Sequence, residues 1–153
     1  MVQTYLSGAG LGCDVLADRG EIVAAICHQR IREYPVTGGP SSCCRCIDRP
    51  DLRNYAQRLV KETGYTGLAM FEFKEDGQGR PHLLEVNPRI WGTFPLTRIS
   101  RSGVPLLWAL LSYNAGNPGA PISLPESPAP LQRKMIFAAS DLMVSLIHIS
   151  EPT

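Results

Sequence analysis

Two short apolar runs separated by turn-forming residues constrain the fold of this chain more than any other feature. The first run, Leu68 to Phe73, carries Glu72, and the second, His82 to Asn87, carries Glu85. The stretch between them, EDGQGRP, is rich in turn formers, which predicts two antiparallel strands joined by a tight connection. Such a hairpin is the unit of an antiparallel sheet, and here it would bring Glu72 opposite Glu85.

The polar side chains of this hairpin form a candidate metal site. Glu85 and Asn87 are two residues apart, so a strand directs both side chains to the same face. With Glu72 they supply three oxygen donors from one 16-residue window, and hard oxygen ligands suit Mg²⁺. Arg89 follows closely, and its planar guanidinium is suited to bind phosphate oxygens in pairs. A single acid in a strand is usually a solvated edge residue, so it is the convergence of these groups that favours a site.

The run LLEVNPRIWG, with an acid thirteen residues upstream of Glu85, resembles the metal-binding signature of the ATP-grasp superfamily. The resemblance is to members of the carbamoyl-phosphate-synthase large-subunit type. It implies that Glu72, Glu85 and Asn87 hold Mg²⁺, with Mn²⁺ as an alternative, at the phosphates of ATP. It also implies that Arg89 is a catalytic residue that contacts phosphate or an acyl-phosphate intermediate. The implied reaction is the ATP-dependent ligation of a small-molecule carboxylate to an amine or a similar acceptor.

The resemblance extends to a second group of residues that would face the nucleotide or the acceptor substrate. The segment PVTGGPSS, read without the family, is a surface loop whose backbone amides are available to an anion. The resemblance instead implies that such a glycine pair, and an HxR element before it, face the nucleotide phosphates or the acceptor substrate. The residues implied in nucleotide binding are His28, Arg30, Gly38, Gly39 and, as an adenosine contact, Gln3.

The remaining pattern predicts an α+β protein, an antiparallel sheet flanked by helices, which the resemblance identifies as the C-terminal half of an ATP-grasp fold. A helix from Asp51 to Gly64 has one apolar face. A second helix, Leu106 to Tyr113, is apolar nearly all round, so we expect it to be buried against the sheet with Trp108 in the core. Further strands are expected at 2–6, 13–17, 21–28 and 132–138.

The domain organisation predicted for the chain has four parts. Residues 1–115 form the ATP-grasp subdomain, incomplete at its N-terminus, and 116–130 form a proline-rich linker. Residues 131–144 begin a further element, and 145–153 resemble a non-native tail that fits no element. The N-terminal ATP-grasp subdomain is expected as a missing partner, since no phosphate-binding lysines or adenine-hinge strand are present. Two functions remain open: part of a ligase that is inactive alone, or a nucleotide- and metal-binding module without catalysis.

Composition limits the kinds of partner that the chain is expected to bind. The net charge is +1 and basic residues are scattered, which offers no electrostatic case for nucleic acid or a membrane surface. The longest apolar run is well below the roughly 18 residues that a spanning helix needs. We therefore expect a cytoplasmic protein.

The chain has five cysteines, an odd number, and three of them are close together in the segment SSCCRC. This argues against a disulfide framework and favours reduced thiols in a loop. A zinc or redox site that combines Cys43, Cys44 and Cys46 with Cys27 and His28 is the alternative, although its spacing differs from that of common zinc modules.

Overall fold

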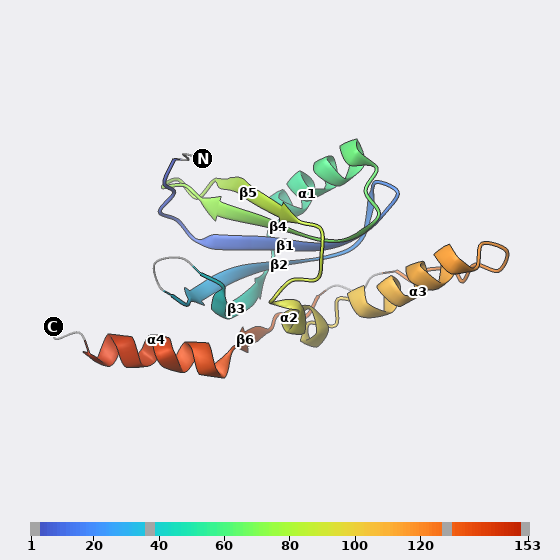
Figure 1. The fold of residues 1–153 in the computed structure, drawn as a ribbon. Helices are drawn as coiled ribbons and strands as arrows, with labels where there is room; N and C mark the ends of the chain where they lie inside the picture. The colour runs from blue at the N-terminus through green and yellow to red at the C-terminus, as the bar shows by residue number, and fades with distance from the viewer. Residues whose placement is uncertain (1–3, 36–38, 127–129, 151–153) are drawn as a thin grey trace.

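The computed structural model describes residues 4–35, 39–126 and 130–150, with side chains described up to residue 144. Within these residues six strands form a single sheet in which all neighbours are antiparallel, and four helices accompany it (Figure 1). The predicted α+β class with an antiparallel sheet is confirmed. The strands are β1 (Gly10–Asp18), β2 (Glu21–Glu33), β3 (Ser41–Ile47), β4 (Gly67–Glu75), β5 (Pro81–Asn87) and β6 (Lys134–Ile136), in the spatial order β5-β4-β1-β2-β3-β6.

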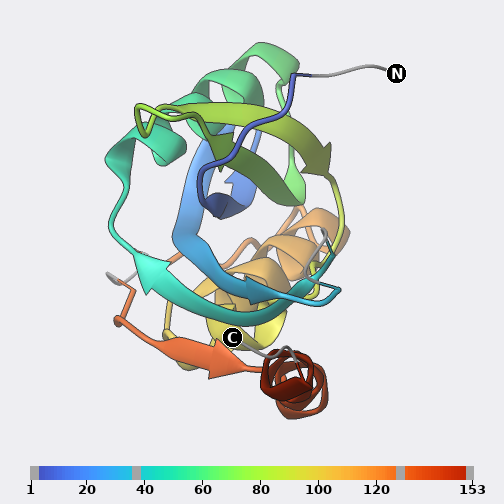
Figure 2. The ribbon, with the colours of Figure 1, turned by 90° about the vertical axis from the view of Figure 1, so that its left-hand side faces the viewer.

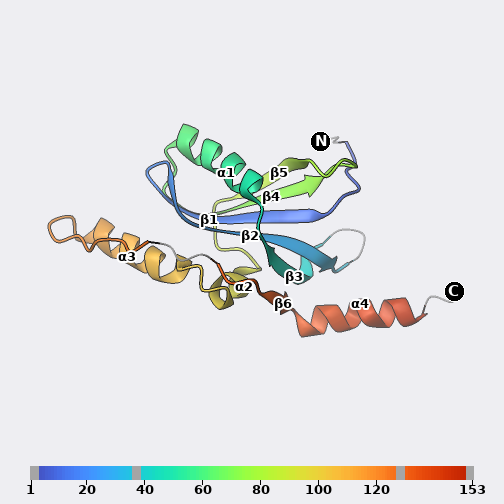
Figure 3. The same ribbon diagram turned by 180° about the vertical axis from the view of Figure 1, so that it is seen from behind.

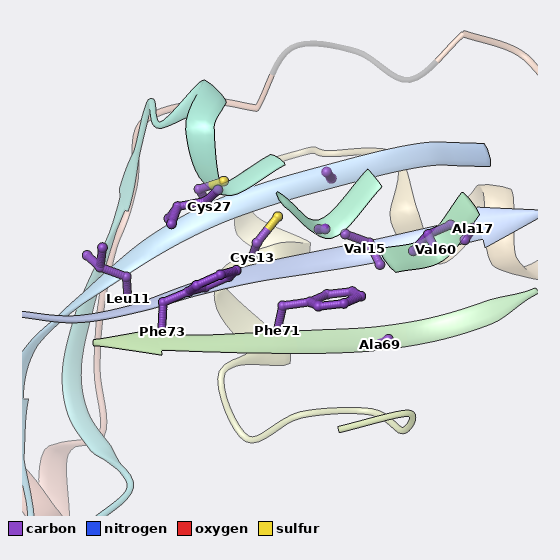
Figure 4. Packing of buried hydrophobic residues seen from close by; sticks show 12 residues of the cluster. Leu11, Cys13, Val15, Ala17, Cys27, Val60, Ala69, Phe71 and Phe73 are labelled. Carbon is purple, nitrogen blue, oxygen red and sulfur yellow. The ribbon is translucent and has the colours of Figure 1, made fainter. Parts of the chain in front are cut away.

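One face of the sheet is covered by α1 (Pro50–Thr63), as Figures 1 and 3 show. The helix starts with a proline, which suits the first turn because its missing N–H needs no partner there. It ends at Gly64, whose φ of 60° closes the helix in the left-handed conformation. Its buried side chains recur every fourth residue and pack on the sheet. The core between α1 and the sheet includes Leu52, Ala56 and Val60 of the helix with Cys13, Val15, Phe71 and Phe73 of the strands (Figure 4).

The opposite face of the sheet is covered by α2 (Phe94–Ile99) and the first turns of α3 (Val104–Gly116). Trp91 packs there with residues of β1, β2 and β4. The prediction that the second helix is buried against the sheet holds for Val104 and Leu107, but the placement of Trp108 in the core is wrong: Leu106 is 59% exposed and Trp108 is 38% exposed. Figure 1 shows that α3 runs out past the end of the sheet, so its C-terminal part lies beyond the strands.

The predicted hairpin is confirmed in its register, because Glu72 pairs directly with Glu85 across β4 and β5. The turn between the strands is closed by the Asp76 carboxylate. Its Oδ1 accepts hydrogen bonds from the backbone N–H groups of Gln78 at 2.9 Å and Arg80 at 3.0 Å. The first strand differs from prediction, since Thr4 to Leu6 have no strand structure and β1 starts only at Gly10. Positions 2 and 3 lie outside the described residues.

The SSCCRC segment belongs to strand β3, so the prediction that its thiols lie in a loop is wrong. All five cysteines are free and buried. Cys44 and Cys46 point to the α2 side and pack with Ile26 and Leu96, and burial raises the pKa of Cys44 to about 12. In the part of the chain that the structure describes, no three His, Cys, Asp or Glu side chains are placed to hold a metal ion. Paired between β2 and β6, this segment is an interior strand of the sheet.

The C-terminal region returns to the sheet edge. Strand β6 lies inside the strand expected at 132–138, and α4 (Ala138–Ser150) follows it, so a helix covers part of the segment expected to fit no element. Asp141 ties α4 to the sheet by accepting two hydrogen bonds from the Arg32 guanidinium, at 2.5 and 2.6 Å. Viewed along the strands, α4 lies at the β6 edge of the curved sheet (Figure 2). None of the helices in the described ranges is long and apolar enough to cross a membrane.

Candidate functional site

The oxygen-donor side chains of β4 and β5 converge on the sheet face opposite α1. Register explains why: Glu72 pairs with Glu85 and Met70 pairs with Asn87, so all three polar side chains share one face. The Asn87 amide Nδ2 donates to Glu72 Oε1 at 3.1 Å and to Glu85 Oε1 at 2.8 Å. Two carboxylates and one amide therefore meet within hydrogen-bond distance, as the hairpin pattern predicted.

Arg30 of β2 joins this cluster from the other side of β1. Its guanidinium Nη2 donates to Glu72 Oε2, and its Nη1 lies 3.6 Å from Glu33 Oε1. The side chain can cross β1 because the position beneath it is a glycine. A Cβ on Gly10 would lie 3.1 Å from both Arg30 Cδ and Glu33 Oε1. The glycine thus leaves room for a cation to reach the carboxylate of Glu72.

Arg89 lies in the loop just after β5 and is exposed. Its Nη2 donates to Asn87 Oδ1 at 3.3 Å and its Nη1 donates to the Ile90 carbonyl at 3.1 Å. The guanidinium is therefore held beside the amide that bridges the two glutamates. A cation at each side of two carboxylates is an arrangement that can bind phosphate groups together with a metal ion.

A cavity of about 410 Å³ opens beside this cluster, with Arg30, Glu72 and Gly39 in its lining. Tyr5, which is largely exposed, and Leu84 of β5 line it as well. The strand register shifts on both sides of the site, in the β2–β3 pair after position 30 and in the β4–β5 pair after position 72. Such bulges bend a strand and redirect its side chains, and they are common next to functional sites.

His28 occupies a different position from the one expected for a nucleotide contact, because its side chain is 1% exposed. Its Nδ1 lies 3.3 Å from Oδ2 of Asp14, which is also buried. That same oxygen accepts a hydrogen bond from Thr97 Oγ1 at 3.3 Å, and Trp91 Nε1 donates to Thr97 Oγ1 at 3.2 Å. His28 and Asp14 therefore join β1 and β2 to α2 and to the segment after Arg89, beneath the open face.

Of the remaining expected contacts, Gly39 lines the cavity, whereas Gln3 and Gly38 lie outside the described residues. Three residues of the site and its support were missed from the sequence: Tyr5, Glu33 and Asp14. The signal for Asp14 was available, since it is an acid inside an otherwise apolar strand, GLGCDVLAD.

The carboxylates Glu72 and Glu85 with the Asn87 amide fit a magnesium ion chemically. All three carry hard oxygen atoms, and Mg²⁺ is usually held by one or two carboxylates while phosphate and water complete its shell. The amide offers an oxygen as well as the nitrogen that now bridges the glutamates. The group is open to solvent on the side of Arg89, which leaves access for a phosphate ligand.

An antiparallel sheet with helices on both faces and this placement of side chains agree with the fold expected for the C-terminal half of an ATP-grasp protein. The chain belongs to the ATP-grasp family described as "ATP-grasp in the biosynthetic pathway with Ter operon", whose model matches residues 1–134. It is also 34% identical over 104 residues to the carbamoyl phosphate synthase large chain of Xylella fastidiosa (strain 9a5c). That alignment covers 61% of this chain and 10% of the relative, so the chain spans about a tenth of that protein's length.

Solved structures share the fold. Biotin carboxylase from Campylobacter jejuni, in complex with β-γ-ATP, has a TM-score of 0.62 and 17% identity, covering 81% of this chain and 28% of that one. The biotin carboxylase domain of Hydrogenobacter thermophilus 2-oxoglutarate carboxylase, in complex with MgADP, ADP and bicarbonate, has a TM-score of 0.50 and 20% identity. Here the match covers 63% of this chain and 23% of that one.

Proposed function

We propose that this chain supplies the magnesium- and phosphate-binding half of an ATP-dependent ligase. The observation that carries the proposal is the convergence of Glu72, Glu85 and Asn87, flanked by Arg30 and Arg89, on one open face of an ATP-grasp sheet. Membership of the ATP-grasp family supports the nucleotide, and the related fold that binds MgADP supports magnesium as its companion.

In this proposal Glu72, Glu85 and Asn87 are the magnesium ligands, and Mn²⁺ can replace magnesium at the same oxygen donors. The bound ion would neutralise charge on the phosphates of ATP. The two glutamates are held close together, because each accepts a hydrogen bond from Asn87 Nδ2. Arg30 additionally fixes the second oxygen of Glu72. Binding of the ion by all three residues would therefore turn the Asn87 amide, because its Oδ1 now accepts a hydrogen bond from Arg89.

Arg89 is the proposed catalytic residue. It lies beside the metal ligands without a carboxylate partner among the described residues, so its guanidinium is free to contact the transferred phosphate. Phosphoryl transfer depends mainly on positioning and on stabilisation of negative charge, and a guanidinium provides both through paired hydrogen bonds. Arg30, Gly39 and, outside the described residues, Gln3 and Gly38 complete the proposed nucleotide contacts.

The proposed substrates are ATP and a small carboxylate, with an amine or similar acceptor. The carboxylate oxygen attacks the γ-phosphorus, the bond to the leaving oxygen of ADP breaks, and an acyl phosphate forms; the amine then displaces phosphate. The open face offers one wall for the nucleotide. We propose that a further ATP-grasp subdomain supplies the other wall. This proposal agrees with the alignment to the carbamoyl phosphate synthase large chain, which covers only 10% of that protein.

Calorimetric titration of the purified chain with ATP, with and without Mg²⁺, tests the proposal. We expect binding that requires Mg²⁺ and that is lost in Glu85→Gln. Glu62→Gln is the matched control, because Glu62 is an exposed acid on α1, which covers the other face. Equal affinities of the two variants would contradict the assignment. A phosphate-release assay with a panel of carboxylates and amines then separates the two possible functions, because binding without turnover is the result expected of a non-catalytic module.

A further inference from the structure

A second cavity, of about 610 Å³, lies on the α1 side of the sheet, away from the proposed magnesium site. Its floor is a row of side chains that crosses four neighbouring strands at one level. The strand register establishes the row, since Leu11 pairs with Gln29, Gln29 with Arg45, and Arg45 with Lys134. Because paired residues in a sheet point to the same side, Arg45 and Lys134 share the face of the buried Leu11, which contacts the α1 core.

The cations in this cavity are unusually placed. Arg45 and Lys134 lie directly opposite each other across β3 and β6, and like charges in that arrangement repel and destabilise a sheet. Arg133 lines the same cavity. Arg45 donates to Gln29 Oε1 at 2.9 and 3.1 Å, and Lys134 interacts electrostatically with Asp141, a carboxylate already paired with Arg32. An anion between Arg45 and Lys134 would relieve the repulsion.

One wall of the cavity is an ion-paired network with one cation and two carboxylates. Arg49 donates to both oxygens of Asp51, at 2.9 and 2.7 Å, and to Glu75 Oε1 at 2.6 Å. It thereby joins the start of α1 to the end of β4. Asp48 also lines the cavity, so the charged residues of the lining are four cations, Arg45, Arg49, Arg133 and Lys134, and two acids, Asp48 and Glu75. The net charge of the lining is therefore positive.

We propose that this cavity is a binding site for a small molecule with two or more anionic groups, phosphate or carboxylate. Its volume of about 610 Å³ lies within the roughly 300–1,000 Å³ range of small-molecule sites. The Arg45 fork and the Lys134 ammonium supply charged donors from two strands, and Gln29 orients the fork. The site does not depend on the proposed ligase function, because it uses other residues on the opposite face of the sheet.

Calorimetric titration of the full chain with sodium pyrophosphate tests the site, in the presence of EDTA and at constant ionic strength. Arg45→Gln and Lys134→Gln should each weaken binding by about tenfold or more, the loss expected for a charged hydrogen bond. Lys61→Gln is the matched control, since Lys61 is an exposed cation at the far end of α1 and should leave binding unchanged. Circular dichroism of each variant verifies the fold.

Two further arms separate the possible outcomes. Arg89→Gln reports pyrophosphate bound at the nucleotide face; if it abolishes binding while Arg45→Gln does not, the anion binds at that face and the proposal is overturned. The proposal would also be overturned if the unaltered chain bound neither pyrophosphate nor citrate. Tighter binding of pyrophosphate than of citrate would assign the site to phosphates, and the reverse would assign it to carboxylates.

Discussion

Replacement of Gly12 by alanine should destabilise the protein through the buried His28–Asp14 pair. Gly12 and His28 face each other across β1 and β2, and the imidazole lies over the glycine. A Cβ at position 12 would lie 2.3, 2.6 and 3.0 Å from three atoms of that ring. The ring cannot move away freely, because it is 1% exposed and lies 3.3 Å from the buried carboxylate of Asp14.

The expected cost follows from this crowding. Overpacking of a rigid core typically costs about 1–3 kcal/mol, and for a chain of this size that corresponds to a fall in Tm of about 2–12 °C. Urea denaturation of Gly12→Ala measures the free energy of unfolding. Gly77→Ala is the control, because a Cβ there meets no atom within 4 Å. The control should change stability by less than about 0.5 kcal/mol.

A double variant isolates the cause. His28→Ala removes the ring that the new methyl group strikes, so Gly12→Ala should cost much less in the His28→Ala background than alone. Contacting residues commonly show coupling energies of about 0.5–3 kcal/mol. Strict additivity of the two changes, or equal stability of Gly12→Ala and Gly77→Ala, would refute the reasoning.

Three further predictions concern the site, one ion-pair network and the thiols. Glu85→Gln should lower turnover by orders of magnitude in a protein that contains both ATP-grasp subdomains; a near-normal rate of phosphate release would oppose the assignment. Arg49→Gln should cost about 1 kcal/mol at pH 7 in urea denaturation, from its contacts with Asp51 and Glu75. The hydrogen bond from Arg49 lowers the pKa of Asp51 in the folded protein. The stabilisation from the Arg49–Asp51 contact is therefore fully present above about pH 4 and declines as the pH falls through the pKa of folded Asp51. An unchanged cost of Arg49→Gln at about pH 3 would contradict this prediction. Cys44, whose pKa burial raises to about 12, should resist a thiol reagent at pH 8 until the protein is unfolded, and rapid labelling of native protein would place it at the surface.

The parts of the fold that were predictable depend on short-range patterns. The β4–β5 hairpin follows from two apolar runs around a turn, and α1 from apolar residues at helical spacing that end at Gly64. The same local pattern determines that Glu72, Glu85 and Asn87 share one face. These features need no information from distant segments, because period and turn chemistry decide them.

The parts that were missed depend on contacts between distant segments. Strand β3 is defined by its pairing with β2 and β6, and its small residues SSCCRC carry little strand signal alone. The burial of His28 depends on Gly12, sixteen positions earlier in the chain, which leaves space for the ring. The exposure of α3 depends on where the sheet ends, and the apolar sequence of the helix does not indicate that position.

Paramagnetic broadening by Mn²⁺ tests the central claim most directly. Nuclear magnetic resonance spectra of the isotope-labelled chain would be recorded with ATP and a small amount of Mn²⁺, which reports sites close to the ion even when binding is weak. The account predicts broadening of the backbone amides around Glu72, Glu85, Asn87 and Arg89, and none in Glu85→Gln. Broadening centred elsewhere, or an unchanged pattern in Glu85→Gln, would contradict the claim that this sheet face binds the metal and the phosphates of ATP.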